Sequence, residues 1–150
     1  MYKFFWGGPF SNWCRSEFTI NNVTYNCGEQ YMMHQKALLF NDNDIANKIM
    51  SAKYPKEQKK LGRLVKNYDN DTWDKNRYDI VKKGLREKFL QNEDLKNELL
   101  KYKGWVIVEA SPEDSLWGIG FHQSNALENK DKWGLNLLGK ILTELTNEIK

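Results

Sequence analysis

An acid and a base are placed two helical turns apart in the stretch GEQYMMHQKALLF, residues 28–40. If this stretch is helical, Glu29 and Lys36 lie about 10 Å apart along the axis, and an advance of about 100° per residue puts both on the apolar side. The opposite, wet face would carry Gln30, His34 and Gln35. A lysine in apolar surroundings has a lowered pKa, so its neutral amine can act as a nucleophile or base beside a proton-transferring carboxyl group.

The same pair also has a purely structural explanation. Lys36 could extend its ammonium group to solvent along the apolar surface, and Glu29 could simply favour the positive end of the helix dipole. The helical plot alone leaves both interpretations open.

A second group of candidates lies in EASPEDSLWGIG, residues 109–120. Glu109 is near the end of a predicted buried strand, and Asp114 and Trp117 follow in a loop. Gly118 would allow the backbone of this loop to approach a ligand closely. The alternative is a tight connection in which Trp117 fills the core and Asp114 caps a turn.

Two further segments offer binding chemistry. The basic run between residues 53 and 66 includes Arg63 and could hold a phosphate or diphosphate, although such runs are also typical of solvated helix faces. The segment GGPFSNW, residues 7–13, contains Ser11 and Asn12 among aromatic residues and could stack on and hydrogen-bond a nucleobase or sugar.

These groups must be positioned by a mainly helical chain. A short strand, a glycine-rich turn and a hairpin around Asn21 and Asn22 are expected before residue 25, and WVIVEA, residues 105–110, is the best strand candidate. Helices are expected over residues 28–40, 45–52, 55–64, 70–90, 92–102 and 131–150. The prediction is an α+β, mostly α, compact single domain, residues 1–150, of about six helices with a small sheet joining the N-terminal strands to residues 105–110.

Composition sets limits on the function. The chain has 150 residues, 40% of them hydrophobic, and 23 basic against 20 acidic residues give a net charge of +3. This balance does not indicate general nucleic-acid or membrane affinity. Because no apolar run approaches about 20 residues, we expect a soluble protein without a membrane anchor. Two cysteines that form no disulfide framework indicate free thiols in the cytoplasm, and we expect a monomer. Cys14 and Cys27 have no metal-ligand spacing, and neither do His34 and His122, so no metal or cofactor is expected.

The order of these pieces resembles the NADAR family, also called YbiA-like. One departure is Gln30, where relatives often carry His, which puts a proton-transfer role at this position in doubt. The matching pieces are FSN at 10–12, GEQY at 28–31 with Lys36 and Ala37, GR at 62–63 after Lys59 or Lys60, Trp73, GLR at 84–86, EASPEDSLWGIG at 109–120 and WGLNLLG at 133–139.

The resemblance implies hydrolysis of the bond between ribose C1′ and a base nitrogen by an N-glycosidase. The implied substrate is ADP-ribose attached to a guanine base of DNA or RNA; the alternatives are phosphoribosylated intermediates of riboflavin synthesis, or non-catalytic binding of ADP-ribose or a related nucleotide. Lys36, with Glu29 or Asp114 as acid/base, would be catalytic. The implied substrate-binding residues are Ser11, Asn12, Tyr31, Arg63, Glu109, Trp117, Gly118, Trp133 and Asn136.

Overall fold

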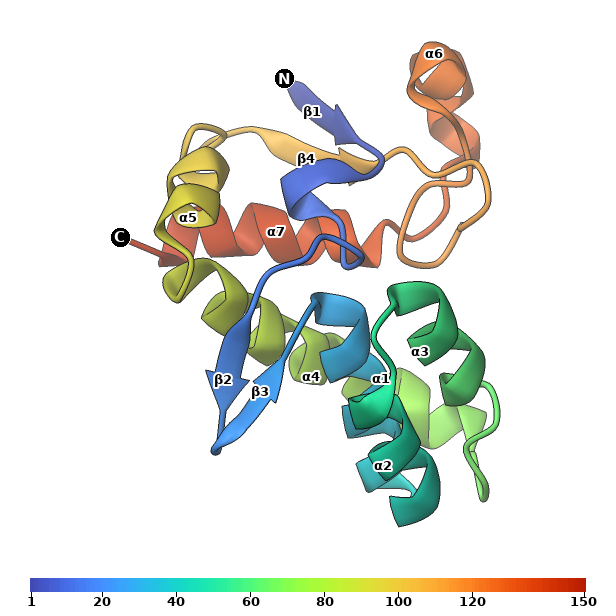
Figure 1. Cartoon of the computed structure of the whole chain (residues 1–150). Coiled ribbons are helices and arrows are strands. Elements are labelled where there is room, and N and C mark those ends of the chain that lie inside the picture. The colour runs from blue at the N-terminus through green and yellow to red at the C-terminus, as the bar shows by residue number, and fades with distance from the viewer. The chain divides into compact units, whose positions relative to one another are not determined.

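Two strands far apart in the sequence pair in parallel. In the computed structural model, which describes residues 1–150, β1 (Tyr2–Phe5) runs beside β4 (Val106–Glu109), with Tyr2 opposite Val106 and Phe5 opposite Glu109 (Figure 1). A parallel pair needs a long crossover connection, and here the connection contains most of the helices. The predicted neighbourhood of the N-terminal strand and residues 105–110 is therefore confirmed for β1.

The chain forms two compact units. One comprises Met1–Ser11 and Glu93–Lys150, and the other comprises Asn12–Asn92. Each unit has its own small sheet, so the hairpin does not join β1 and β4 in one sheet as expected. The hairpin strands pair with each other in the second unit instead.

In the first unit, α7 (Leu137–Glu148) packs on β4, and α5 (Glu93–Leu100) contacts both α7 and η1 (Gly8–Phe10). A short α6 (Gln123–Ala126) and η2 (Leu127–Lys132) precede α7. The expected helix over residues 131–150 is therefore too long. It begins only after Asn136, whose φ of 51° lies in the left-handed region and cannot continue a right-handed helix.

The second unit begins with a hairpin. Strands β2 (Phe18–Ile20) and β3 (Val23–Tyr25) are antiparallel, and Asn21 and Asn22 between them have φ values of 50° and 66°. Asparagine tolerates this left-handed conformation, which two-residue hairpin turns require. The predicted hairpin is confirmed.

Helix α1 (Gly28–Leu39) is the centre of the second unit. It contacts β3 and three helices, which are α2 (Asn43–Ser51), α3 (Pro55–Gly62) and α4 (Asn70–Leu90). Because these elements pack around it, α1 has no solvent-exposed face at Gln30 and His34, which are only 3% and 9% exposed. The expectation that these two residues point to solvent is wrong.

Gln30 instead has a structural role. Its side-chain Oε1 accepts a hydrogen bond from the backbone N–H of Asn26, and its Nε2 donates to the carbonyl of Ile49. The first bond supports the start of α1 in the manner of a capping box, and the second ties α1 to α2.

The α+β, mostly α fold class is confirmed, with seven α-helices rather than about six. None of these helices combines the length and the apolar composition that crossing a bilayer requires.

Candidate active site

Glu29 is fixed at the first turn of α1. Its backbone N–H donates to the carbonyl of Asn12 at 2.9 Å, and Glu29 is only 3% exposed. Gly28 permits this contact, because a Cβ there would come within 2.7 Å of Asn12 Oδ1. The positive end of the helix dipole therefore lies at a buried carboxyl group.

Lys36 lies towards the other end of α1 and is half-buried. Its Nζ is 4.7 Å from the ring centre of Tyr68. Burial lowers the pKa of Lys36, the charge of Glu29 raises this pKa, and the charge of Arg63 lowers it. Burial is the largest of the three effects, so the net result is a pKa of Lys36 below its ordinary value.

Arg63 follows directly after α3 and is exposed. It is the member of the basic run whose charge acts on Lys36. The helix before it packs closely on α1, because a Cβ at Gly62 would overlap the side chain of Met33. The lysines of the run are solvated, and their exposed positions are Lys53, Lys56, Lys59, Lys60 and Lys66.

In the first unit, the loop after β4 is built around Asp114. Its Oδ1 accepts hydrogen bonds from the backbone N–H groups of Leu116 and Trp117, each at 2.9 Å. A Cβ at Gly118 would lie 2.8 Å from Oε2 of Glu109, so this glycine brings the loop backbone against that carboxyl group. Asp114 thus caps the turn with its Oδ1, as the structural alternative predicts. Trp117 is only half-buried.

Asn136 connects the same loop to the sheet. Its Oδ1 accepts from the backbone N–H of Glu109 at 3.0 Å, and its Nδ2 donates to the carbonyl of Ile107 at 3.1 Å. Its own backbone N–H donates to the carbonyl of Gly118. Asn136 therefore holds the backbone of Glu109 directly through one hydrogen bond and ties Ile107 and Gly118 to the same point through two more.

Trp133 is also held in place. Its indole N–H donates to the carbonyl of Ala126 at 2.8 Å, and its ring meets Tyr2 and Phe4 edge to face. This packing leaves Trp133 half-buried at the border of the cluster formed by Val108 and its neighbours.

The remaining predicted substrate-binding residues lie before α1 or within it. Ser11 is half-buried and donates its backbone N–H to the carbonyl of Gly8. Oδ1 of Asn12 is buried and makes no hydrogen bond within the protein. The hydroxyl of Tyr31 donates to the carbonyl of Ile80 at 2.9 Å, and its ring packs on Tyr25.

The structure brings together Glu29, Lys36 and Arg63 in one unit, and Glu109, Asp114, Gly118 and Asn136 in the other. Sequence reasoning missed Tyr68, whose ring contacts the Lys36 ammonium. No spacing rule could have found it, because α2 and α3 separate it from α1 in the sequence.

The comparison with known protein families determines to which family this chain belongs. The sequence profile of the NADAR domain matches residues 4–150. This chain belongs to the NADAR family. The resemblance expected from the FSN, GEQY, GR and WGIG segments is thereby confirmed.

NADAR relatives include proteins with named activities. N-glycosidase R617 of Acanthamoeba polyphaga mimivirus is 47% identical over 146 residues, covering 93% of this chain and 86% of that protein. The chloroplastic riboflavin biosynthesis protein PYRR of Zea mays is 34% identical over 110 residues, covering 71% of this chain but only 16% of that protein. The expectation that the family includes hydrolases of N-glycosyl bonds is confirmed by the first of these names.

A solved structure agrees with the fold. The NMR structure of the Escherichia coli protein YbiA matches with a TM-score of 0.81 at 25% sequence identity, covering 99% of this chain and 84% of that one. The α+β arrangement is therefore that of a NADAR protein.

Proposed function

We propose that this NADAR protein is an N-glycosidase that removes ADP-ribose from a modified nucleobase by cleaving the ribose C1′–N bond. The observation that carries the proposal is the environment of Lys36. Burial lowers the pKa of this half-buried amine, and a buried carboxyl group lies two turns earlier on the same helix. A protein that only binds a nucleotide does not need a lysine with a lowered pKa in apolar surroundings.

The proposed reaction uses the ring-opened sugar. Ring opening breaks the C1′–O4′ bond, O4′ takes a proton, and C1′ becomes doubly bonded to the base nitrogen. The Nζ of Lys36 then adds to C1′ and reduces that double bond to a single bond. The C1′–base bond breaks, the base nitrogen leaves with a proton from a carboxyl group, and an imine remains between Nζ and C1′. Water then adds to C1′, the C1′–Nζ bond breaks, and the sugar leaves as an aldehyde while the amine is regenerated. A carboxylate near C1′ also stabilises the positive charge that develops there.

The other residues are assigned supporting roles. Arg63, whose planar guanidinium suits phosphate oxygens, would bind the diphosphate. Ser11, Asn12, Tyr31, Glu109, Gly118 and Asn136 would contact the substrate or position the groups that do, and Trp117 and Trp133 would shape the pocket. Asp114 is the alternative proton carrier, because one of its carboxylate oxygens makes no backbone hydrogen bond.

Borohydride trapping tests the covalent step. Guanine-ADP-ribosylated DNA is incubated with the protein and borohydride, and the adduct is located by peptide mass spectrometry. We expect an adduct on Lys36 in the native protein and in Lys56→Ala, which replaces an exposed lysine of α3, and none in Lys36→Ala. Release of the sugar without any adduct would remove the covalent role of Lys36.

A second substrate class is favoured by one observation, the riboflavin biosynthesis name of the maize relative. The same release assay is therefore run with phosphoribosylated riboflavin intermediates and with free ADP-ribose. Release from the riboflavin intermediates alone would show that these intermediates, and not an ADP-ribosylated base, are the substrate. Binding of ADP-ribose without release from any substrate would show that the protein is a non-catalytic binding protein.

The proton carrier is identified by two isosteric substitutions, Glu29→Gln and Asp114→Asn. Asparagine keeps the oxygen that accepts from Leu116 and Trp117, so Asp114→Asn preserves the turn. We expect kcat to fall about 10²–10⁴-fold in the variant that loses the proton carrier, and Glu29 is our assignment. A larger loss in Asp114→Asn would assign the role to Asp114.

A further inference from the structure

A recess lies on the side of α1 that does not carry Glu29 and Lys36. It encloses about 270 Å³ between the β2–β3 hairpin, α1 and α4. Its walls are mostly apolar and aromatic, with Tyr25 and Tyr31 among them, and its polar groups come from His34, Gln35 and Lys83. Ligand pockets typically combine such walls with a few directed polar groups.

The hydrogen bonds in this recess determine which atoms are available. Nε2 of Gln35 donates to the Tyr25 hydroxyl at 3.1 Å, and that hydroxyl lies 2.8 Å from Nδ1 of His34. The Tyr25 hydroxyl has one proton and two lone pairs, so besides accepting from Gln35 it can either donate to Nδ1 of a neutral His34 or accept from it. In both cases this bond uses Nδ1 and leaves Nε2 of the ring for another partner. Burial lowers the pKa of His34, which favours this neutral form. Nε2 of His34 therefore makes no hydrogen bond within the protein, and neither does the side-chain carbonyl oxygen of Gln35.

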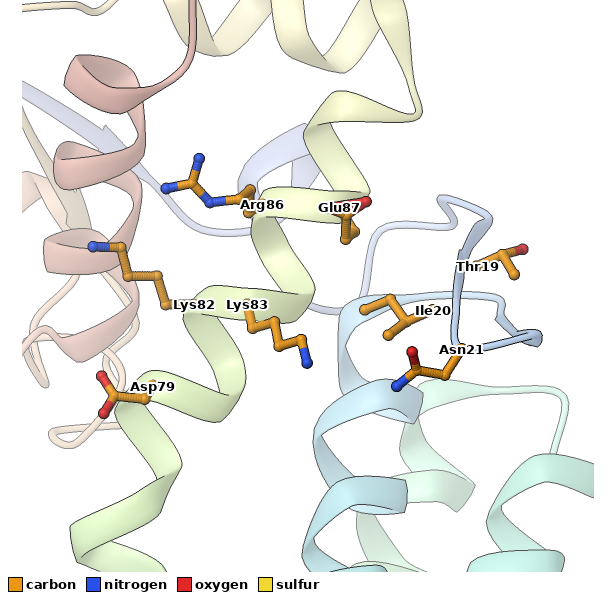
Figure 2. A pocket seen from close by; sticks show the side chains of 8 residues that line it. All are labelled: Thr19, Ile20, Asn21, Asp79, Lys82, Lys83, Arg86 and Glu87. Carbon is orange, nitrogen blue, oxygen red and sulfur yellow. The ribbon is translucent and has the colours of Figure 1, made fainter.

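A second, more open cavity of about 590 Å³ continues from the recess and shares Ile20, Asn21 and Lys83 with it. Figure 2 shows Lys83 reaching from α4 towards the hairpin, where Ile20 and Asn21 lie, whereas Lys82 extends from the other side of the helix. Lys83 is exposed and forms no ion pair. Lys83 therefore marks the junction of the two cavities. The outer cavity is also lined by two further cations, Lys82 and Arg86, and by the carboxylates of Asp79 and Glu87.

We propose that the recess and its outer cavity form a second binding site for a nucleoside monophosphate. The planar base would occupy the recess, where Nε2 of His34 and the Gln35 carbonyl oxygen offer two hydrogen-bonding positions to its edge. Its phosphate would lie in the outer cavity at Lys83. The proposal does not rest on the glycosidase assignment, because none of Glu29, Lys36 and Arg63 lines either cavity. Tyr31, a wall of the recess, is the one residue that also has an assigned role in the glycosidase site.

NMR titration with three probes tests the site, using GMP, guanosine and inorganic phosphate. We expect GMP to shift the amide signals of His34, Gln35 and Lys83 in a saturable manner. Guanosine should shift the first two more weakly, and phosphate alone should affect only Lys83. Equal effects of phosphate and GMP, or GMP shifts confined to residues outside the two cavities, would overturn the proposal.

Charge reversal separates this site from the proposed active site. Lys83→Glu should weaken GMP binding at His34 and Gln35 at least about ten-fold, because it places a negative charge at the phosphate. The matched control Lys75→Glu, on the same helix but outside both cavities, should bind as the native protein does. Lys36→Ala should lose glycosidase activity yet keep these shifts. Equal binding by the two charge-reversed variants, or loss of the shifts in Lys36→Ala, would contradict the proposal.

Discussion

At the scale of single residues, the chemistry depends on the protonation of Lys36. Three effects act on its pKa, and they do not have the same sign. Burial and the positive charge of Arg63 lower the pKa, whereas the negative charge of Glu29 raises it. Because the residue is half-buried, each effect is moderated by solvent, and the balance can be tested one neighbour at a time.

The two charged neighbours should shift the Lys36 pKa in opposite directions. Arg63→Gln removes a repelling charge, so the pKa should rise, and activity should need a higher pH to reach its plateau. Glu29→Gln removes an attracting charge, so the pKa should fall. NMR titration of the Lys36 side-chain Cε signal measures both shifts independently of the residual activity.

The control for these titrations is Lys60→Gln, which removes an exposed charge of the same basic run. It should leave the Lys36 pKa close to that of the native protein. If Arg63→Gln and Glu29→Gln shift the pKa in the same direction, the electrostatic account of Lys36 is wrong.

At the scale of the elements, glycines allow two helices to approach α1. A Cβ at Gly62 of α3 would overlap Met33, and a Cβ at Gly84 of α4 would overlap the ring of Tyr31. These positions explain why both glycines stand inside helices, where glycine is otherwise unfavourable by about 1 kcal/mol. The helix that carries Glu29 and Lys36 is thus positioned by backbone-to-side-chain contacts.

Gly84→Ala tests this packing. Helix propensity alone predicts a gain of about 1 kcal/mol in the free energy of unfolding, but overpacking against Tyr31 should give a net loss of about 1–3 kcal/mol. Urea denaturation measures the difference. The control Lys75→Ala, at an exposed site of α4, should change stability by less than about 0.5 kcal/mol. A stabilised Gly84→Ala variant would show that α1 and α4 do not pack as closely as described.

At the scale of the whole molecule, the chain contains a fully buried lysine that sequence analysis did not single out. Lys88 of α4 is 0% exposed, and its Nζ lies 5.0 Å from the ring centre of Phe89. Burial lowers the pKa of Lys88 to about 8. Folding must therefore either keep a charged amine away from water or release its proton, and the stability of the protein depends on pH as a result.

Stability should rise with pH between about 8 and 10.5, because over this range the unfolded chain holds a proton on Lys88 that the folded protein has released. Lys88→Met lacks this contribution. The free energy of unfolding of the native protein relative to that variant should therefore increase by up to about 3 kcal/mol across the range. Urea denaturation of both proteins at about pH 7.5, 9 and 10 checks the slope. A difference that stays constant with pH would show that Lys88 titrates normally.

The sequence by itself determined the local elements and the family. Asn21 and Asn22 specify their hairpin, Pro55 begins its helix, and the separated FSN, GEQY and WGIG segments identify a NADAR chain. These features depend on backbone preferences and residue order, which act over a few positions or are read directly from the chain.

Only the tertiary structure decided which polar residues are buried and which sheet each strand joins. Gln30 and His34 fit a solvent-exposed helix face by periodicity, yet neighbouring elements cover both residues, and both side chains form hydrogen bonds within the protein. The contact of Tyr68 with Lys36 and the burial of Lys88 likewise depend on packing between elements distant in sequence. Periodicity describes one element at a time, whereas burial and pKa are set by everything that surrounds it.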